Sequence, residues 1–491
     1  MARAVRVDMG DSVATLVEDA APGERIDGLG VVSHGAIPRG HKVALMHLAA
    51  GDAVMKYGHS IGIAKRAIAP GDHVHSDNLQ TGLAGTLDYR YEPAAVRKPS
   101  PGATAATFQG YVRADGRVGT RNEIWILPTV GCVARTAQRI ADRSAAALAD
   151  RVGGVHAFSH PHGCSQLGDD LGGTRAILAS LACHPNAGGV LIIGLGCEEN
   201  QLGALLATIS PERRGAIRTL TAQTSADEVA EGCALVAELA EQAACARSEV
   251  ALDRLVLGVK CGGSDGLSGL TANPLVGRVS DRVAGAGGRV IATEIPEMFG
   301  AERTLMARAA DESVFDRLVD VVNGFKRYFL DHGEPVSENP SPGNIAGGIT
   351  TLEEKSLGAV QKAGRTVVAD VIPYGAQVAR DGLTVLEAPG NDAVSSTALA
   401  AAGATVILFT TGRGTPMGFP VPTVKIASNS DLAARKPGWI DFDAGVVVND
   451  GVDIAEEALV DTICAVASGT ETAAERSGER EIAIWKRGVT L

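Results

Sequence analysis

Four cysteines follow predicted strands at the points where those strands end. Cys132, Cys164, Cys197 and Cys261 each lie within a few residues of a short apolar run typical of a buried strand. The carboxyl ends of parallel strands meet at one edge of a sheet, where ligands bind, so we expect the four thiols to share that edge. Thiolates there suit a soft or borderline metal such as iron or zinc. For any one of them, a small residue tolerated in a tight turn is an equal alternative.

Histidine and carboxylate side chains accompany these thiols. His160 lies shortly before the second cysteine, Glu198 directly follows the third, and Glu294 and Glu297 come after another predicted strand. Such a set can bind a metal ion or supply general acids and bases. The spacing alone does not distinguish these two uses.

Several basic residues are candidates for holding an anionic ligand. Arg413 lies in a glycine-rich loop after a predicted strand, where a guanidinium among free backbone N–H groups can grip a carboxylate or phosphate. Arg121 and Lys355 are further cationic candidates, and each can equally be an ordinary surface charge. His41 and Lys42 belong to a basic cluster near the N-terminus, which we interpret as part of a substrate-gripping lid.

The elements that position these residues form an α/β protein with a small β domain at its N-terminus. Short strands and glycine-rich turns predict a β domain over residues 1–95, and a Pro- and Ala-rich linker follows over 96–107. Strands then alternate with helices, which predicts mostly parallel, Rossmann-like sheets. We divide this part into two α/β domains, 108–248 and 249–491.

Composition excludes several classes of protein. The chain has 491 residues, with 45 Lys and Arg against 57 Asp and Glu, and its formal net charge of −12 argues against nucleic-acid and membrane partners. No apolar run resembles a signal peptide or a bilayer-spanning segment, so we expect a cytoplasmic protein whose cysteines are not paired. The chain lacks a correctly placed dinucleotide fingerprint and a Walker-type loop, which disfavours a nicotinamide oxidoreductase and a nucleotide triphosphatase.

The motifs together resemble the altronate/galactarate dehydratase family over essentially the whole chain. They are Gly119-Thr-Arg-Asn, His160-Pro-His-Gly-Cys-Ser-Gln, Gly194-Leu-Gly-Cys-Glu198, Cys261-Gly-Gly-Ser-Asp265, Thr271-Ala-Asn-Pro274 and Thr411-Gly-Arg-Gly-Thr-Pro416. Residues 40–77 are similar to the β-clip-like SAF domain that this family carries at its N-terminus. Three further segments, 123–130, 296–302 and 388–394, look more like the altronate than the galactarate members.

The resemblance implies a carbon–oxygen lyase that eliminates water from D-altronate to give 2-dehydro-3-deoxy-D-gluconate in hexuronate catabolism. It also implies a ferrous or manganous ion. The candidate metal ligands are His160, Cys164, Cys197, Glu198 and Cys261. The candidate acids and bases are His160, Glu198, Glu294 and Lys355, and the candidate substrate-binding residues are His41, Lys42, Arg121 and Arg413.

Other interpretations remain open at this point. An iron–sulfur cluster with an open iron can also dehydrate hydroxy acids, and Cys132 would then join the ligands. Galactarate dehydration and sulfolactate desulfonation belong to similar architectures, and a sugar-acid-binding protein without activity is the alternative from another class. On base rates alone we expect a homodimer.

Overall fold

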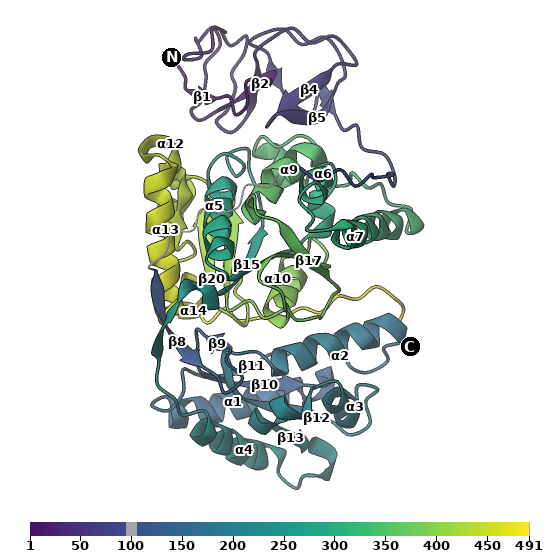
Figure 1. Cartoon of the computed structure of the whole chain (residues 1–491), viewed down its shortest axis with the longest axis vertical. Coiled ribbons are helices and arrows are strands. Elements are labelled where there is room, and N and C mark those ends of the chain that lie inside the picture. The colour runs from purple at the N-terminus through teal and green to yellow at the C-terminus, as the bar shows by residue number, and fades with distance from the viewer. Residues whose placement is uncertain (95–105, 491) are drawn as a thin grey trace.

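The computed structural model describes residues 1–94 and 106–490. Three domains are stacked, with the C-terminal domain between the N-terminal β domain and the second domain (Figure 1). The predicted class, a small β domain followed by α/β domains with parallel sheets, is confirmed. The linker expected at 96–107 lies almost entirely outside the described residues.

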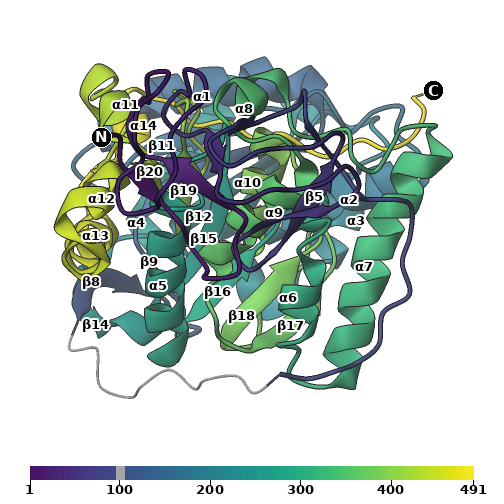
Figure 2. The same ribbon diagram turned by 90° about the horizontal axis from the view of Figure 1, so that it is seen from above.

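The N-terminal domain consists of two small antiparallel sheets. One contains β1 (Ala4–Val5), β2 (Val13–Leu16), β3 (Lys42–Ala44) and β6 (His73–Val74), and the other contains β4 (Ala53–Lys56), β5 (His59–Ala64) and β7 (Leu79–Gln80). Its apolar core continues into the C-terminal domain, because Ala301 and Leu357 pack among its buried residues. Seen from above, this domain lies across the C-terminal domain (Figure 2).

The second domain has a four-stranded parallel sheet between helices. Its strands are β10 (Glu123–Pro128), β11 (Val155–Ala157), β12 (Ala187–Gly194) and β13 (Ile217–Thr221), in the order β11-β10-β12-β13. The helices are α1 (Ala134–Leu148), α2 (Gly168–Ala182), α3 (Leu202–Ala207) and α4 (Glu228–Gln242). Side chains alternate between the faces of β10, so Ile124 and Ile126 pack with α1 and α4 while Trp125 and Leu127 pack with α2.

The C-terminal domain contains a seven-stranded parallel sheet in the order β17-β18-β16-β15-β19-β20-β21. The strands are β15 (Val256–Cys261), β16 (Arg289–Ala292), β17 (Val368–Ile372), β18 (Gly382–Leu386), β19 (Val406–Thr411), β20 (Thr423–Ala427) and β21 (Phe442–Asp443). The helices are α5 (Ala272–Gly285), α6 (Glu302–Met306), α7 (Glu312–Asp331), α8 (Pro342–Ala346), α9 (Leu352–Ala359), α10 (Asp392–Ala401), α11 (Ser430–Arg435), α12 (Val447–Asp450), α13 (Val452–Ala467) and α14 (Ala473–Arg476).

A small antiparallel sheet of β8 (Thr107–Val112), β9 (Val118–Gly119) and β14 (Ser248–Ala251) lies where the chain enters and leaves the second domain. Among the described helices, none has both the length and the apolar character needed to span a bilayer.

A buried ion-pair cluster joins the N-terminal domain to α9. Lys42 Nζ donates to the carbonyl of Gly348, to Thr350 Oγ1 and to Glu354 Oε2, at 2.7, 2.8 and 2.8 Å. Lys56 Nζ lies 2.9 Å from Glu354 Oε1. Burial alone would raise the pKa of Glu354, but the two ammonium groups outweigh it and hold the pKa at about 2.

A second junction joins the second domain to the C-terminal domain. One apolar core contains Trp125 and Phe158 from the second domain together with α10 and Ile407 from the C-terminal domain. The last residues of the chain cross between the two domains and end beside α2 (Figure 1), where Ile482 and Ile484 enter the same core. The two α/β domains therefore share buried apolar area.

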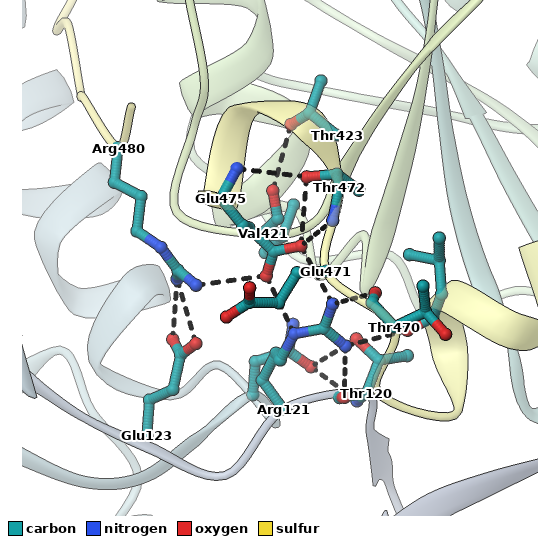
Figure 3. Close-up of polar contacts among 12 residues, drawn as sticks. Thr120, Arg121, Glu123, Val421, Thr423, Thr470, Glu471, Thr472, Glu475 and Arg480 are labelled. Carbon is teal, nitrogen blue, oxygen red and sulfur yellow. Dashed lines mark hydrogen bonds and ion pairs between the residues drawn. The ribbon is translucent and has the colours of Figure 1, made fainter. Parts of the chain in front are cut away.

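Arg121 lies at this junction with every guanidinium donor engaged (Figure 3). Its Nε and Nη2 donate to Glu475 Oε1 and Oε2 at 2.8 and 2.9 Å, a bidentate pair. The remaining three N–H groups donate to the carbonyls of Thr120, Val466 and Thr470. Arg480 extends the network by pairing with Glu475 and with Glu123 of β10.

This geometry differs from the expectation that Arg121 and Lys42 bind substrate. Both side chains are buried, and the five donors of Arg121 and the three donors of Lys42 are all directed at protein acceptors. A substrate would have to displace these partners. Both residues therefore hold domains together.

We expect Arg121→Met to lower the free energy of unfolding by about 3–5 kcal/mol, because it leaves Glu475 buried and without its bidentate partner. Thermal or urea unfolding of the whole chain measures this loss. The matched control is Arg218→Met, whose guanidinium pairs with Glu238 at the surface and should matter little. Equal losses in the two variants would contradict the assignment.

We expect the stabilisation from Glu354 to disappear in acid. Because its pKa in the folded chain is about 2, below the ordinary value of 4.5, the contribution is complete above about pH 4.5 and is lost as the pH falls toward 2. The difference in melting temperature between wild type and Glu354→Gln should therefore shrink between about pH 6 and pH 3. Glu241→Gln, at an exposed position, serves as the control and should show no such convergence.

Candidate active site

A cleft of about 450 Å³ opens beyond the carboxyl ends of the large sheet. Gly262 and Gly263 follow β15, Glu297 follows β16, and Gly390 to Asp392 follow β18 and begin α10. The loop at 334–350 and helix α9 close another side with Asn339, Ser341, Asn344 and Lys355. This is the position at which parallel α/β sheets bind ligands.

Glu297 and Lys355 form an ion pair that lines this cleft. Glu297 Oε1 lies 2.8 Å from Lys355 Nζ, which also donates to Asn339 Oδ1 at 3.2 Å. Burial works against both charges, but Lys355 and Lys362 still lower the pKa of Glu297, and Glu297 raises the pKa of Lys355. The cleft therefore presents a carboxylate and an ammonium group side by side.

Cys261 and Glu294 lie directly behind this pair. The Cys261 thiol donates to Glu297 Oε2 and lies 3.2 Å from Lys362 Nζ, while its backbone N–H donates to Glu294 Oε2 at 3.0 Å. Burial raises the pKa of Cys261 to about 12, so the side chain is a thiol at neutral pH. Glu294 has φ of 68°, which is uncommon for a residue other than glycine and typical of a constrained functional segment.

Lys260 connects this buried layer to the far side of the cleft. Its Nζ lies 2.9 Å from Glu294 Oε1 and 2.6 Å from Asp392 Oδ1, and its side chain is wholly buried. Both carboxylates raise the pKa of Lys260 against the opposing effect of burial. Asp392 is the first residue of α10, whose N-terminus is capped by Asn391. The buried lysines thus neutralise every carboxylate around Cys261.

Cys261, Glu294 and Glu297 could also offer metal ligands. Among the described residues they are the one set of three His, Cys, Asp or Glu whose ligand atoms all lie within 4.8 Å of one another. However, Lys362 Nζ is 3.2 Å from both Cys261 Sγ and Glu294 Oε2. The Lys362 ammonium group therefore already supplies, next to these side chains, the positive charge that a metal ion would bring.

The expectation that four cysteines share one sheet edge is wrong. Cys132, Cys164 and Cys197 follow β10, β11 and β12 of the second domain, whereas Cys261 ends β15 of a different sheet. The alternation of strands and helices is the same in both domains, so the position of a cysteine after a strand does not tell which sheet that strand joins. The predicted domain boundary between residues 248 and 249 does separate Cys261 from the other three cysteines.

His160 and Glu198 also lie in the second domain, away from the residues that line the cleft. His160 Nε2 is 2.8 Å from the carbonyl of Pro128, and burial lowers its pKa to about 4, so it is a neutral imidazole. Glu198 accepts from Thr129 Oγ1 and from the backbone N–H groups of Leu195 and Gly196, at 2.6, 3.1 and 2.6 Å. Of the four predicted acids and bases, Lys355 and Glu294 come together with Cys261.

Two predicted substrate-binding residues remain to be placed. His41 is buried, with Nδ1 3.0 Å from His73 Nε2, and burial with the neighbouring His75 lowers its pKa to about 4. Arg413 is exposed, and its Cβ would lie 3.2 Å from a Cβ on Gly263 of the cleft. Arg413 is therefore the predicted arginine that lies beside the cleft.

Sequence reasoning missed most of the buried charges. The sequence patterns do not single out Lys260, Lys362 or Asp392, and they give Glu297 no role separate from that of Glu294. Two signals are present in the sequence: Lys260 lies directly before Cys261 at the end of a predicted strand, and Glu297 lies shortly after Glu294. Lys362 and Asp392 come from distant segments, and their pairing depends on how α9 and α10 pack.

Family descriptions match all three domains. "Altronate/galactarate dehydratase SAF domain" matches residues 2–82, "D-galactarate dehydratase/Altronate hydrolase, second domain" matches 110–244, and "D-galactarate/Altronate dehydratase, C-terminal" matches 252–490. The chain is 49% identical to an altronate dehydratase of Escherichia coli and 46% identical to one of Bacillus subtilis, with 99% of each chain covered. It is 34% identical to a galactarate dehydratase (L-threo-forming) of Escherichia coli over 95% of this chain and 92% of the relative. The chain therefore belongs to the D-galactarate/altronate dehydratase family.

Proposed function

We propose that the protein is an altronate dehydratase, a hydro-lyase that eliminates water from D-altronate to give 2-dehydro-3-deoxy-D-gluconate. The observation that carries this proposal is the 46–49% identity to two altronate dehydratases over 99% of the chain. Identity to the galactarate dehydratase is lower, at 34%. The cleft supports the same class of chemistry, because it holds a charged base and a charged acid in contact.

The reaction requires a base, an acid and positive charge near the substrate carboxylate. The proton to be removed lies α to a carboxylate, so its removal builds up negative charge that must be stabilised. The Glu297 carboxylate is charged and accepts this proton, while the Lys355 ammonium group can protonate the leaving 3-hydroxyl. Arg413, exposed beside Gly263, provides positive charge for the substrate carboxylate.

The divalent metal that the family resemblance implies does not fit the buried Cys261, Glu294 and Glu297 group. A thiolate and two carboxylates suit ferrous or manganous ions in type. Here, however, Cys261 is a thiol, and Lys260, Lys355 and Lys362 already neutralise the carboxylates. A divalent ion would add positive charge to a set that is already balanced, so we assign no step of the reaction to a metal at this place.

The substrate proposal is tested by anaerobic turnover of D-altronate beside galactarate and sulfolactate. We expect selective formation of the 2-keto-3-deoxy acid from altronate. Preference for either other acid would overturn the substrate assignment. Binding of altronate without any turnover would instead favour a sugar-acid-binding protein.

We expect Glu297→Gln and Lys355→Met each to lower kcat by about 10²–10⁴-fold, because each removes one partner of proton transfer. The chain offers a matched control in Glu302→Gln and Lys326→Met. Those two residues also form a buried ion pair at 2.8 Å, but neither lines the cleft. Comparable losses of kcat in folded control variants would show that the effect is structural and contradict the assignment.

A further inference from the structure

Two asparagine side chains that line the cleft have amide nitrogens without a protein partner. Asn339 belongs to the loop at 334–350, and Asn391 precedes α10 on another side of the cleft. Asn391 is exposed and Asn339 is half-buried, so a ligand in the cleft can reach both. The proton transfer that we assign to Glu297 and Lys355 uses neither of them.

Lys355 fixes the orientation of the Asn339 amide. Lys355 Nζ donates to Asn339 Oδ1 at 3.2 Å. An ammonium group has only donors, so the amide oxygen faces Lys355 and the amide nitrogen lies at the other end of the plane. Within the described ranges, Asn339 Nδ2 donates to no protein acceptor. Its two N–H groups are therefore available to a ligand in the cleft.

The start of helix α10 orients the Asn391 amide in the same way. Asn391 Oδ1 accepts from the backbone N–H groups of Ala393 and Val394, both at 3.1 Å, and so caps the helix. Because these backbone groups only donate, the amide oxygen faces the helix and the nitrogen does not. In the part of the chain that the structure describes, Asn391 Nδ2 also donates to no protein acceptor.

Both amides belong to segments that contact the ion pair of the cleft. Asn339 contacts Lys355, whose Nζ lies 2.8 Å from Glu297 Oε1. Asn391 directly follows Gly390, and a Cβ on Gly390 would lie 3.8 Å from the same Glu297 oxygen. A substrate placed for proton transfer at this pair therefore lies between segments that carry uncharged hydrogen-bond donors.

A third asparagine of the same cleft differs from these two. Asn344 is buried, and its Nδ2 donates to the carbonyl of Ser264 at 2.7 Å. Its Oδ1 accepts from the backbone N–H and the Oγ of Ser341, at 3.1 and 2.9 Å. Both ends of the Asn344 amide thus hold the loop at 334–350 in place. Amide nitrogens without a partner are therefore particular to Asn339 and Asn391 among the asparagines that line the cleft.

We propose that Asn339 and Asn391 determine substrate specificity by donating hydrogen bonds to the hydroxyl oxygens at C4 to C6 of the sugar acid. The inference rests on the proposed function, in which Arg413, Glu297 and Lys355 act on the carboxylate, the α-proton and the leaving 3-hydroxyl. The oxygens that remain are uncharged acceptors, and uncharged amide N–H groups match them. A site built to bind a hydroxyl group rejects an analogue that lacks it, because the donor then stays buried without an acceptor.

The test compares kcat/KM of the full chain for D-altronate and for its 4-, 5- and 6-deoxy analogues. For the wild type we expect loss of a recognised hydroxyl to lower kcat/KM by about 2- to 10-fold, the factor of one uncharged hydrogen bond. Asn339→Leu has nearly the same shape without the donor, and Asn391→Ser keeps a capping oxygen for α10. Each variant should lose the preference for one hydroxyl. Asn449→Leu, at an exposed position outside the cleft, should keep every preference.

The ratio between substrates separates recognition from a structural role, because a loss of order in the cleft lowers kcat/KM for all four acids alike. Equal losses for all of them would overturn the proposal, as would a wild type that uses the three deoxy analogues as well as D-altronate. Preference for galactarate would refute the substrate assignment alone, and deoxygalactarates then give the same ratios. If the chain binds sugar acids without turnover, the ratio of Kd values replaces that of kcat/KM.

Discussion

The arrangement of the C-terminal domain depends on neutralising charge that is buried at the end of β15. Lys260, Lys355 and Lys362 there meet Glu294, Glu297 and Asp392, and Cys261 stays a thiol among them. A charge buried without its partner would cost several kcal/mol, so each of these groups requires the others. Because they come from β15, α9, α10 and the segments after β16 and α9, these elements must all be in place before the charges balance.

Helix α9 extends the same constraint to the N-terminal domain. Glu354 and Lys355 are neighbours in this helix, and one side chain pairs with Lys42 and Lys56 while the other pairs with Glu297 in the cleft. Docking of the N-terminal domain therefore fixes the helix that carries Lys355. Lys42, which we interpreted as part of a substrate-gripping lid, instead pairs with Glu354 of α9 and so helps to position a cleft residue.

The sequence predicts the fold well because hydrophobic periodicity reports local structure. It predicts the site less well because the ion pairs there join side chains from distant segments. Alternating strands and helices indicated the two α/β domains correctly, and Cys261, Glu294 and Lys355 do converge. Arg121 is a substrate-binding candidate from its charge alone, yet its partner Glu475 is 354 residues away in the sequence. In the same way, the position of a cysteine after a strand does not tell which sheet the strand joins, whereas the predicted domain boundary between residues 248 and 249 does separate Cys261 from the other three cysteines.

An anionic substrate would change the interaction between the Lys355 and Glu297 charges as it binds in the cleft. Lys355 is the group that most directly lowers the pKa of Glu297, against a desolvation effect that raises it. A sugar-acid carboxylate or hydroxyl that draws the Lys355 ammonium group toward itself weakens that attraction, and the pKa of Glu297 then rises. A carboxylate with a higher pKa is a stronger base. Glu297 therefore has little driving force to abstract a proton in the empty cleft and gains it when substrate separates the two charges, while the hydrogen bond from the Cys261 thiol keeps the Glu297 carboxylate in place.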